Sequence, residues 1–184
     1  LPAAGAAHGL KVSSICVAIC THDRHADLAR LVEHLAPQLR AAAARLVVVD
    51  NGRHPAADSL ANLGKDIDCS YHRLAEPGLV AARNAALRHS LETSPEFIAF
   101  IDDDEVPDPG WLQAMAADLQ SSGADICCGP LRPRFDAPAP RWAVDGGFFA
   151  KTGRHIGTGN IMFRSAILPQ DEAAWFQPAF AHTG

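Results

Sequence analysis

Short apolar segments alternate with amphipathic stretches along the first two thirds of the chain, and this alternation predicts the fold. Three segments are mostly apolar and rich in β-branched or aromatic residues, as buried strands are, and they span residues 12–20, 46–49 and 97–101. Residues 68–74 predict a further strand, the third along the chain. Between them, residues 56–63, residues 79–91 and the stretch after Asp23 have the composition or spacing of helices. Strands that alternate with helices indicate the α/β class, with a mostly parallel central sheet and helices on both of its faces.

Local signals predict where the remaining helices and strands begin and end. The first helix has apolar residues at helical spacing, namely Leu28, Leu31, Val32 and Leu35. Asp23 is a good N-cap for this helix, and Pro37 is expected to disturb or end it. A further amphipathic helix follows Pro109, with its apolar stripe at residues 111–119, and residues 125–129 predict one more buried strand.

Regular periodicity is lost after Pro130. Proline and glycine are dense from residue 130 to 147, which is typical of long loops that act as lids or binding loops in compact domains. Gly157-Thr158-Gly159-Asn160 then leads into the apolar residues 161–163. The glycines allow either a close approach of the backbone to a ligand or a plain turn into a strand, and the sequence leaves both open.

Composition limits the classes of function. A chain of 184 residues with 48% hydrophobic and 20% charged residues suits one soluble domain. The net charge of −5, without a basic block, argues against nucleic-acid binding, and no apolar run has the length of a membrane span. The five cysteines are expected to be reduced and buried, which favours a cytoplasmic protein. Residues 1–11 lack signal-peptide features and are expected to be a disordered or artificial lead-in.

Four consecutive acids, Asp102, Asp103, Asp104 and Glu105, follow the apolar segment at residues 97–101. Ligands of open α/β sheets bind beyond the carboxyl ends of the strands, and adjacent carboxylates repel one another unless something neutralises them. Carboxylate oxygens suit Mg²⁺ or Mn²⁺, so a site for a divalent cation is the favoured interpretation. A solvated acidic turn is the alternative.

Polar residues also end the first two predicted strands, at residues 21–24 and 50–52. They could face one ligand together with the acids. Arg83, in the predicted helix at residues 79–91, has a guanidinium group that can bind a phosphate as a bidentate pair. A solvated helix face explains this arginine equally well.

Taken in order, these motifs resemble family 2 glycosyltransferases. The residues that carry the resemblance are Thr21-His22-Asp23-Arg24, Asp50-Asn51-Gly52, the GLVAARN segment at residues 78–84, and Asp102-Asp103-Asp104. The resemblance runs from about Ser13 to the end of the chain, and residues 142–149 and 157–164 are similar to the subgroup that builds bacterial polysaccharides, including succinoglycan-type transferases. It implies an inverting enzyme with the GT-A fold, a Rossmann-like α/β/α sandwich. Residues 12–184 would form a single domain, with a nucleotide-binding part at 12–129 and acceptor-side loops at 130–184.

The resemblance also implies site residues. The nucleotide-sugar-binding residues would be Thr21, His22, Arg24, Asp50, Asn51, Arg83, Asp102 and Asp103. Among these, Asp50 would pair with the base, typically uracil, and Arg83 would approach the ribose or the diphosphate. Asp104 and Asp102 would hold Mn²⁺ or Mg²⁺ against the leaving diphosphate. Trp142, Gly159 and Asn160 would lie on the acceptor or sugar side.

The implied reaction moves a sugar from a nucleotide-sugar donor, a UDP-sugar by family expectation, to a saccharide or lipid-linked acceptor in cell-surface polysaccharide synthesis. The protein would be cytoplasmic, at the inner face of the membrane where the acceptor is lipid-linked. One departure matters, because the family's general base, usually in a Glu-Asp pair after a glycine-rich turn, has no match before Gly184. We therefore expect a truncated chain that keeps the donor site and loses most turnover. The spacing of Asp171 and Glu172 fits the base poorly, and His182 could act as a base by its chemistry but its position disfavours it.

Two alternatives remain open. Residues 102–106 also fit the DxDxV motif of haloacid-dehalogenase-type phosphatases, in which an aspartate attacks phosphorus with the help of Mg²⁺. In that family the motif follows the first strand, whereas about four predicted strands precede it here, and no lysine lies at a convincing later strand end. The second alternative is a nucleotide-binding module without catalysis. A dinucleotide oxidoreductase is disfavoured because no GxGxxG follows the first strand.

Overall fold

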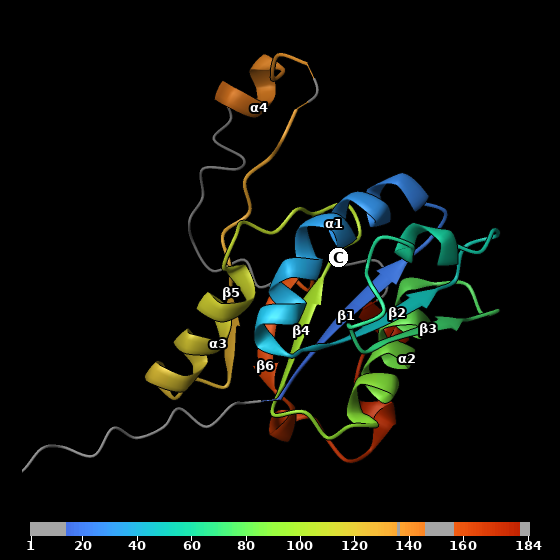
Figure 1. Cartoon of the computed structure of the whole chain (residues 1–184), viewed down its shortest axis with the longest axis vertical. Helices are drawn as coiled ribbons and strands as arrows, with labels where there is room; N and C mark the ends of the chain where they lie inside the picture. The colour runs from blue at the N-terminus through green and yellow to red at the C-terminus, as the bar shows by residue number, and fades with distance from the viewer. Residues whose placement is uncertain (1–13, 136, 146–156, 181–184) are drawn as a thin grey trace, which may run out of the picture.

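The computed structural model describes residues 14–135, 137–145 and 157–180, and these fold around a six-stranded sheet (Figure 1). Its strands are β1 (Ile15–Thr21), β2 (Arg45–Asp50), β3 (Cys69–Arg73), β4 (Phe97–Ile101), β5 (Ile126–Cys128) and β6 (Asn160–Arg164). The helices are α1 (His25–Ala42), α2 (Leu79–Leu91), α3 (Trp111–Ser122) and the short α4 (Arg141–Asp145). Single 3₁₀ turns lie at Ala57–Leu60, Ser165–Ile167, Glu172–Ala174 and Pro178–Phe180.

The strand order places the ends of three strands together. The order is β3-β2-β1-β4-β6-β5, with β1 parallel to both β2 and β4, and β2 parallel to β3. Thr21 of β1 lies opposite Asp50 of β2, so the polar residues that follow these strands emerge at one edge. β6 runs antiparallel to β4 with Asn160 opposite Ile101, and β5 runs antiparallel to β6. The prediction of a mostly parallel sheet is therefore confirmed.

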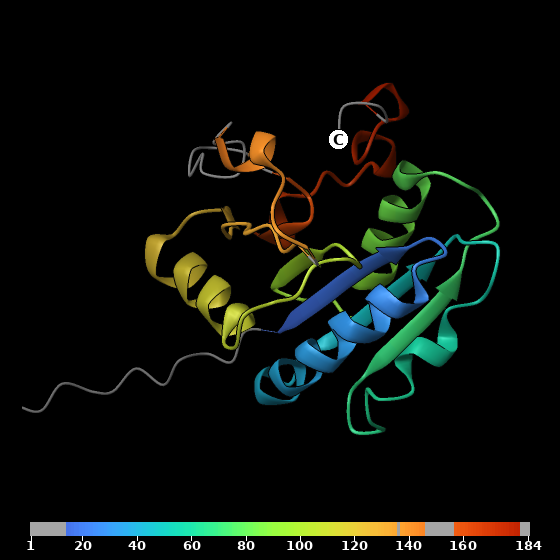
Figure 2. The same cartoon turned by 90° about the horizontal axis from the view of Figure 1, so that it is seen from above.

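Helices cover both faces of this sheet, as Figure 2 shows for α1 and α2. Successive side chains of a strand point to opposite faces, so β4, with all five residues buried, feeds two apolar layers. One layer joins the strands to α1 and α3. The other joins them to α2, whose contribution is mostly alanine, and it is completed by Leu168, Trp175 and Phe176 from the segment after β6. This is the α/β/α sandwich that the sequence predicts.

Two features expected of α1 are not found, namely an end at Pro37 and a cap by Asp23. The helix does not end at Pro37 but continues to Ala42, because its buried stripe extends through Leu39 and the packing offsets the backbone hydrogen bond that proline cannot donate. Gln38 adds a tertiary contact by accepting a hydrogen bond from the backbone N–H of Leu112 at 3.0 Å. Asp23 does not cap the helix, since its carboxylate instead accepts the backbone N–H groups of residues 53 and 54.

Three smaller predictions also need correction. Residues 56–63 contain only the 3₁₀ turn Ala57–Leu60. β5 is an edge strand, so Ile126 and Cys128 are exposed although the apolar run predicts a buried strand. All five cysteines are free thiols, but Cys128 is exposed and the others are buried or partly buried.

Other predictions concern residues outside the described part of the chain and stay predictions. They are the lead-in at residues 1–11, the first two residues of the strand predicted at 12–20, the glycine-rich residues 146–149, and His182. In the described part, no helix combines the length and the apolar character needed to cross a bilayer.

Candidate functional site

A cavity of about 560 Å³ lies where β1, β2 and β4 end, beside the start of α2. Its lining residues are Cys20, Thr21, His22, Arg24, Asn51, Gly78, Leu79, Ala82, Arg83, Asp102, Asp103 and Asp104. Small-molecule sites are commonly about 300–1,000 Å³ in volume, so the cavity is large enough for a nucleotide-sized ligand. The structure thus brings together, from four separate segments, most of the residues that the sequence predicts for a donor site.

Asp103 is the buried anchor of the acidic segment. Thr21 Oγ1 donates a hydrogen bond to its Oδ2 at 2.7 Å, and Arg24 Nη1 donates one to its Oδ1 at 3.1 Å. Burial raises the pKa of Asp103, while the hydrogen bond from Thr21 and the charge of Arg24 oppose that rise. These contacts fix the end of β4 to the end of β1 and hold Arg24 above the acids.

Asp104 is the outward-facing acid, with half of its side chain exposed. Arg24 Nη1 lies 2.6 Å from Asp104 Oδ2, so one guanidinium group bridges Asp103 and Asp104. Within the described residues, no three or more His, Cys, Asp or Glu side chains are grouped to hold a metal ion. Mg²⁺ in nucleotide sites is commonly held by one or two carboxylates, with phosphate and water oxygens as the other ligands. The oxygen donors of Asp102 and Asp104 therefore fit a divalent cation that binds together with a phosphate ligand.

Arg83 is a buried cation without a hydrogen-bonding partner among the residues that the structure describes. It is 8% exposed and lines the cavity, and no hydrogen bond or ion pair joins its guanidinium to another residue of the described chain. Burial raises the pKa of the neighbouring Asp102, and the charge of Arg83 works in the opposite direction. Because burying an unpaired charge is costly, this guanidinium is well placed for an anionic ligand.

His22 and Asn51 connect the segments that follow β1 and β2 with the start of α2. Asn51 Nδ2 donates a hydrogen bond to the carbonyl of Gly78 at 3.0 Å, and His22 Nδ1 lies 3.1 Å from Asn51 Oδ1. The side chain of Asn51 is thereby held across the space between the end of β2 and the start of α2.

Asp50 lies beneath the cavity and does not line it. Its side chain has no exposed surface, and it accepts hydrogen bonds from the backbone N–H of Gly52 and of Ala56 and from the hydroxyl of Tyr71. Arg73 Nη1 lies 2.8 Å from its Oδ2. Burial alone would raise the pKa of Asp50, but these hydrogen bonds together lower it. The predicted contact with a base stays a prediction, and a ligand could reach this carboxylate only if an internal partner moved.

The three acceptor-side residues lie in different places. Gly159 abuts the acids, since a Cβ on it would lie 2.6 Å from both Asp102 Oδ2 and Glu105 Oε1. The amide of Asn160 is used internally, because its Oδ1 accepts a hydrogen bond from Trp111 Nε1 at 2.8 Å. Trp142 is 68% exposed on α4, which stands away from the sheet (Figure 1).

Glu105 belongs to the acidic run that the sequence predicts, whereas the other site residues below have no assigned role in the sequence-based prediction. Burial, with the charges of Asp102 and Asp104, raises the pKa of Glu105 to about 7, and Cys20, Leu79 and Ala82 supply apolar lining. Gly78 opens α2 with a φ of 115°, a value that favours glycine. The Glu-Pro-Gly turn before α2 was the available signal for this last residue, whereas the others depend on packing.

The fold is that of the GT-A glycosyltransferases, as two solved structures show. S. aureus TarS (residues 1–349), solved in complex with UDP-GlcNAc, matches with a TM-score of 0.62 and 18% identity over 83% of this chain and 46% of TarS. Glucosyl-3-phosphoglycerate synthase from Mycobacterium tuberculosis, solved with Mn²⁺, UDP and glucosyl-3-phosphoglycerate, matches with a TM-score of 0.59 and 16% identity over 84% of this chain and 57% of the synthase.

The chain belongs to glycosyl transferase family 2, whose sequence profile matches residues 16–173. It is 32% identical over 139 residues to the succinoglycan biosynthesis protein ExoM of Rhizobium meliloti (strain 1021). That match covers 73% of this chain and 44% of ExoM, so the chain spans about half the length of the relatives that it matches. Membership confirms the family resemblance over the phosphatase alternative. The general base expected beyond Gly184 stays a prediction.

Proposed function

We propose that this chain carries the donor site of a glycosyltransferase that moves a sugar from a UDP-sugar to a saccharide or lipid-linked acceptor, with inversion. The observation that carries the proposal is the distribution of charge in the cavity, where the guanidinium of Arg83, unpaired within the described residues, shares the lining with the carboxylates of Asp102 and Asp104. A nucleoside diphosphate bound with a divalent cation complements both signs of charge. Its phosphates suit the guanidinium, and its cation suits the acids.

The charged residues of the cavity then have distinct tasks. Asp104 and Asp102 would hold Mn²⁺ or Mg²⁺, which supplies charge neutralisation to the departing diphosphate. Arg83 donates hydrogen bonds to diphosphate oxygens. Asp103 holds Thr21 and Arg24 in place through the hydrogen bonds described above, which keeps a second guanidinium near the phosphates. The main contribution of the chain is therefore to position the donor for attack by an acceptor hydroxyl.

The relatives support the finer parts of this proposal. TarS is solved with UDP-GlcNAc and the mycobacterial synthase with UDP and Mn²⁺, which favours a uridine donor and a divalent cation. The name of ExoM favours a role in polysaccharide synthesis. The five free thiols are consistent with a cytoplasmic location, and we expect peripheral membrane association if the acceptor is lipid-linked.

Thermal unfolding with and without ligand tests the donor site. UDP with Mn²⁺ at about 100 times its Kd should add about 2.7 kcal/mol to the free energy of unfolding, because the ligand binds only the folded chain. UDP or Mn²⁺ alone should add less, and GDP with Mn²⁺ tests the choice of base. If UDP with Mn²⁺ leaves the Tm unchanged, the proposed function is wrong.

The variant Asp104→Asn tests the cation site. It should remove the Mn²⁺-dependent part of the Tm shift, whereas Asp108→Asn should keep it. Asp108 is a suitable control because its carboxylate is exposed and pairs with Arg132 outside the cavity. An unchanged Mn²⁺ dependence in Asp104→Asn would remove Asp104 from the proposed ligand set.

A further inference from the structure

Residues 165–176, which we call the strap, run along α2 from the end of β6 back to the cavity. At its start, the backbone N–H of Ser165 donates to the carbonyl of Glu96, just before β4. At its end, Phe176 lies beside Asn84 and Arg83, next to the cavity. The strap therefore connects the amino-terminal end of β4 with the neighbourhood of the donor site.

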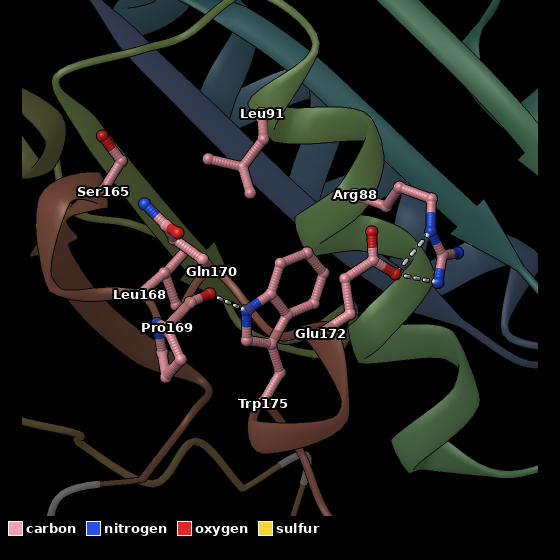
Figure 3. Close-up of a pocket in the computed structure, with 8 residues that line it drawn as sticks. All are labelled: Arg88, Leu91, Ser165, Leu168, Pro169, Gln170, Glu172 and Trp175. Atoms are coloured by element: carbon pink, nitrogen blue, oxygen red, sulfur yellow. Dashed lines mark hydrogen bonds and ion pairs between the residues drawn. The ribbon is translucent and has the colours of Figure 1, made fainter.

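The strap is fixed to α2 at two points. Arg88 Nε and Nη2 donate to Glu172 Oε2 at 3.0 and 2.8 Å, and Figure 3 shows this pair beside Trp175. One helical turn closer to the cavity, Asn84 Nδ2 donates to the carbonyl of Phe176 at 2.9 Å, and the N–H of Phe176 donates to Asn84 Oδ1 at 3.0 Å. Because Asn84 satisfies both backbone groups of Phe176, that residue is held in one place along α2.

This attachment places the ring of Phe176 between the core and the cavity. The ring packs edge to face on Phe100, with 6.1 Å between ring centroids, while the guanidinium carbon of Arg83 lies 5.6 Å from the ring centroid of Phe176. A cation at this distance from an aromatic face is attracted to it. The ring is thus a restraint on a side chain that has no hydrogen bond to hold it within the described chain.

We infer that Phe176, held by Asn84, is a positioning residue that keeps the Arg83 guanidinium directed into the cavity before a nucleoside diphosphate binds. The inference rests on the proposed function, since it takes the diphosphate as the ligand of Arg83. An arginine side chain has many rotamers, and fixing it in advance removes part of the entropy cost that binding would otherwise carry. Asn84 and Phe176 act through Arg83 and do not themselves contact the donor.

Calorimetric titration of UDP in the presence of Mn²⁺ tests this role in a double-mutant cycle. Phe176→Leu should weaken UDP binding about fivefold to tenfold, the range expected for loss of a buried cation–π contact. Phe176→Tyr keeps an aromatic face and should bind as the wild type does. Gln170→Ala changes an exposed strap residue and is the matched control, with no expected change in Kd.

The decisive comparison is Phe176→Leu in an Arg83→Gln background. If Phe176 acts through Arg83, it should cause no further loss there. An equal loss in both backgrounds, or no loss in the wild-type background, would overturn the inference. If Phe176→Leu unfolds too readily for titration, Asn84→Ala gives the same comparison. Failure of the wild type to bind UDP would instead refute the proposed function, so the two failures are distinguishable.

Discussion

Two buried charges lie near the carboxyl edge of the same sheet, and their surroundings differ. Asp50, at the end of β2, is enclosed by two backbone N–H groups, a tyrosine hydroxyl and an arginine. Arg83, one turn into α2, has an aromatic neighbour but no hydrogen-bonding partner in the described chain. The difference indicates that Asp50 stabilises the loop that follows β2, whereas Arg83 is available to a ligand. The number of internal partners of a buried charge therefore helps to distinguish a structural role from a role in ligand binding.

The largest expected effect comes from Asp50→Asn. An amide cannot replace all the accepted hydrogen bonds and leaves Arg73 without its counter-charge, so the free energy of unfolding should fall by about 3 kcal/mol. Urea unfolding measures this loss. Asp66→Asn is the matched control, since that carboxylate forms a surface pair with Arg40 and should cost less than about 1 kcal/mol. Equal losses for the two variants would remove the structural role assigned to Asp50.

Arg83→Met tests the other side of the comparison. Replacing an unpaired buried cation with an apolar chain should change the free energy of unfolding by less than about 1 kcal/mol. The same variant should weaken UDP binding in Mn²⁺ about 30-fold, the value expected for loss of charged hydrogen bonds. Arg30→Met, at an exposed pair with Asp27 on α1, should leave the Kd unchanged. If Arg83→Met lowered the free energy of unfolding but bound UDP as the wild type does, Arg83 would have a structural role and not a ligand-binding one.

The pH dependence of stability under acidic conditions should also distinguish the role of Asp50 from that of Arg83. The folded pKa of Asp50 is lowered, so near pH 4 the unfolded chain binds more protons and stability rises with pH. The contribution of Asp50 is therefore present above about pH 5 and is lost as the pH falls through the lowered pKa. Urea unfolding between about pH 3 and 6 should show a shallower slope in Asp50→Asn than in Arg83→Met. Parallel profiles would contradict the lowered pKa.

The smallest effect is expected at His72, whose ring stacks on His89 with 3.4 Å between centroids. Burial and the nearby His89 lower the pKa of His72, whereas Glu92 favours the protonated form and Arg45 opposes it. The neutral ring thus stabilises the fold above about pH 6.5, and this contribution is lost as the pH falls through the lowered pKa. His72→Phe should flatten the stability profile between about pH 5 and 7 by less than about 1 kcal/mol. An unchanged slope would show that the pKa of His72 is the same in the folded and the unfolded chain.

Much of the fold, and the grouping of residues in the cavity, could be predicted because the sequence marks where strands end. The apolar run at residues 97–101 and the helix at 79–91 match β4 and α2 in their bounds, and the polar residues after three strands meet in one cavity. Parallel pairing makes this convergence nearly unavoidable, since strands in register end at the same edge.

The hydrophobic pattern does not predict which way a side chain at or after a strand end points. Asp50 turns inward because Tyr71 and Arg73, on the neighbouring β3, supply partners that a local pattern does not reveal. Arg24 bridges two acids roughly 80 positions away, as the separations of 79 and 80 residues show. The contact of Phe176 with Asn84 likewise depends on the path of the strap over α2.

The order of the strands constrains how this protein can be recombined with its relatives. β6, which comes from the later part of the chain, is inserted between β4 and β5, so Phe163 pairs with Ile98 on one side and Ile126 on the other. A chimaera joined near residue 129 would exchange the central member of this three-strand ladder. A chimaera designed to change donor or acceptor specificity should therefore exchange loops and keep β4, β6 and β5 from one parent.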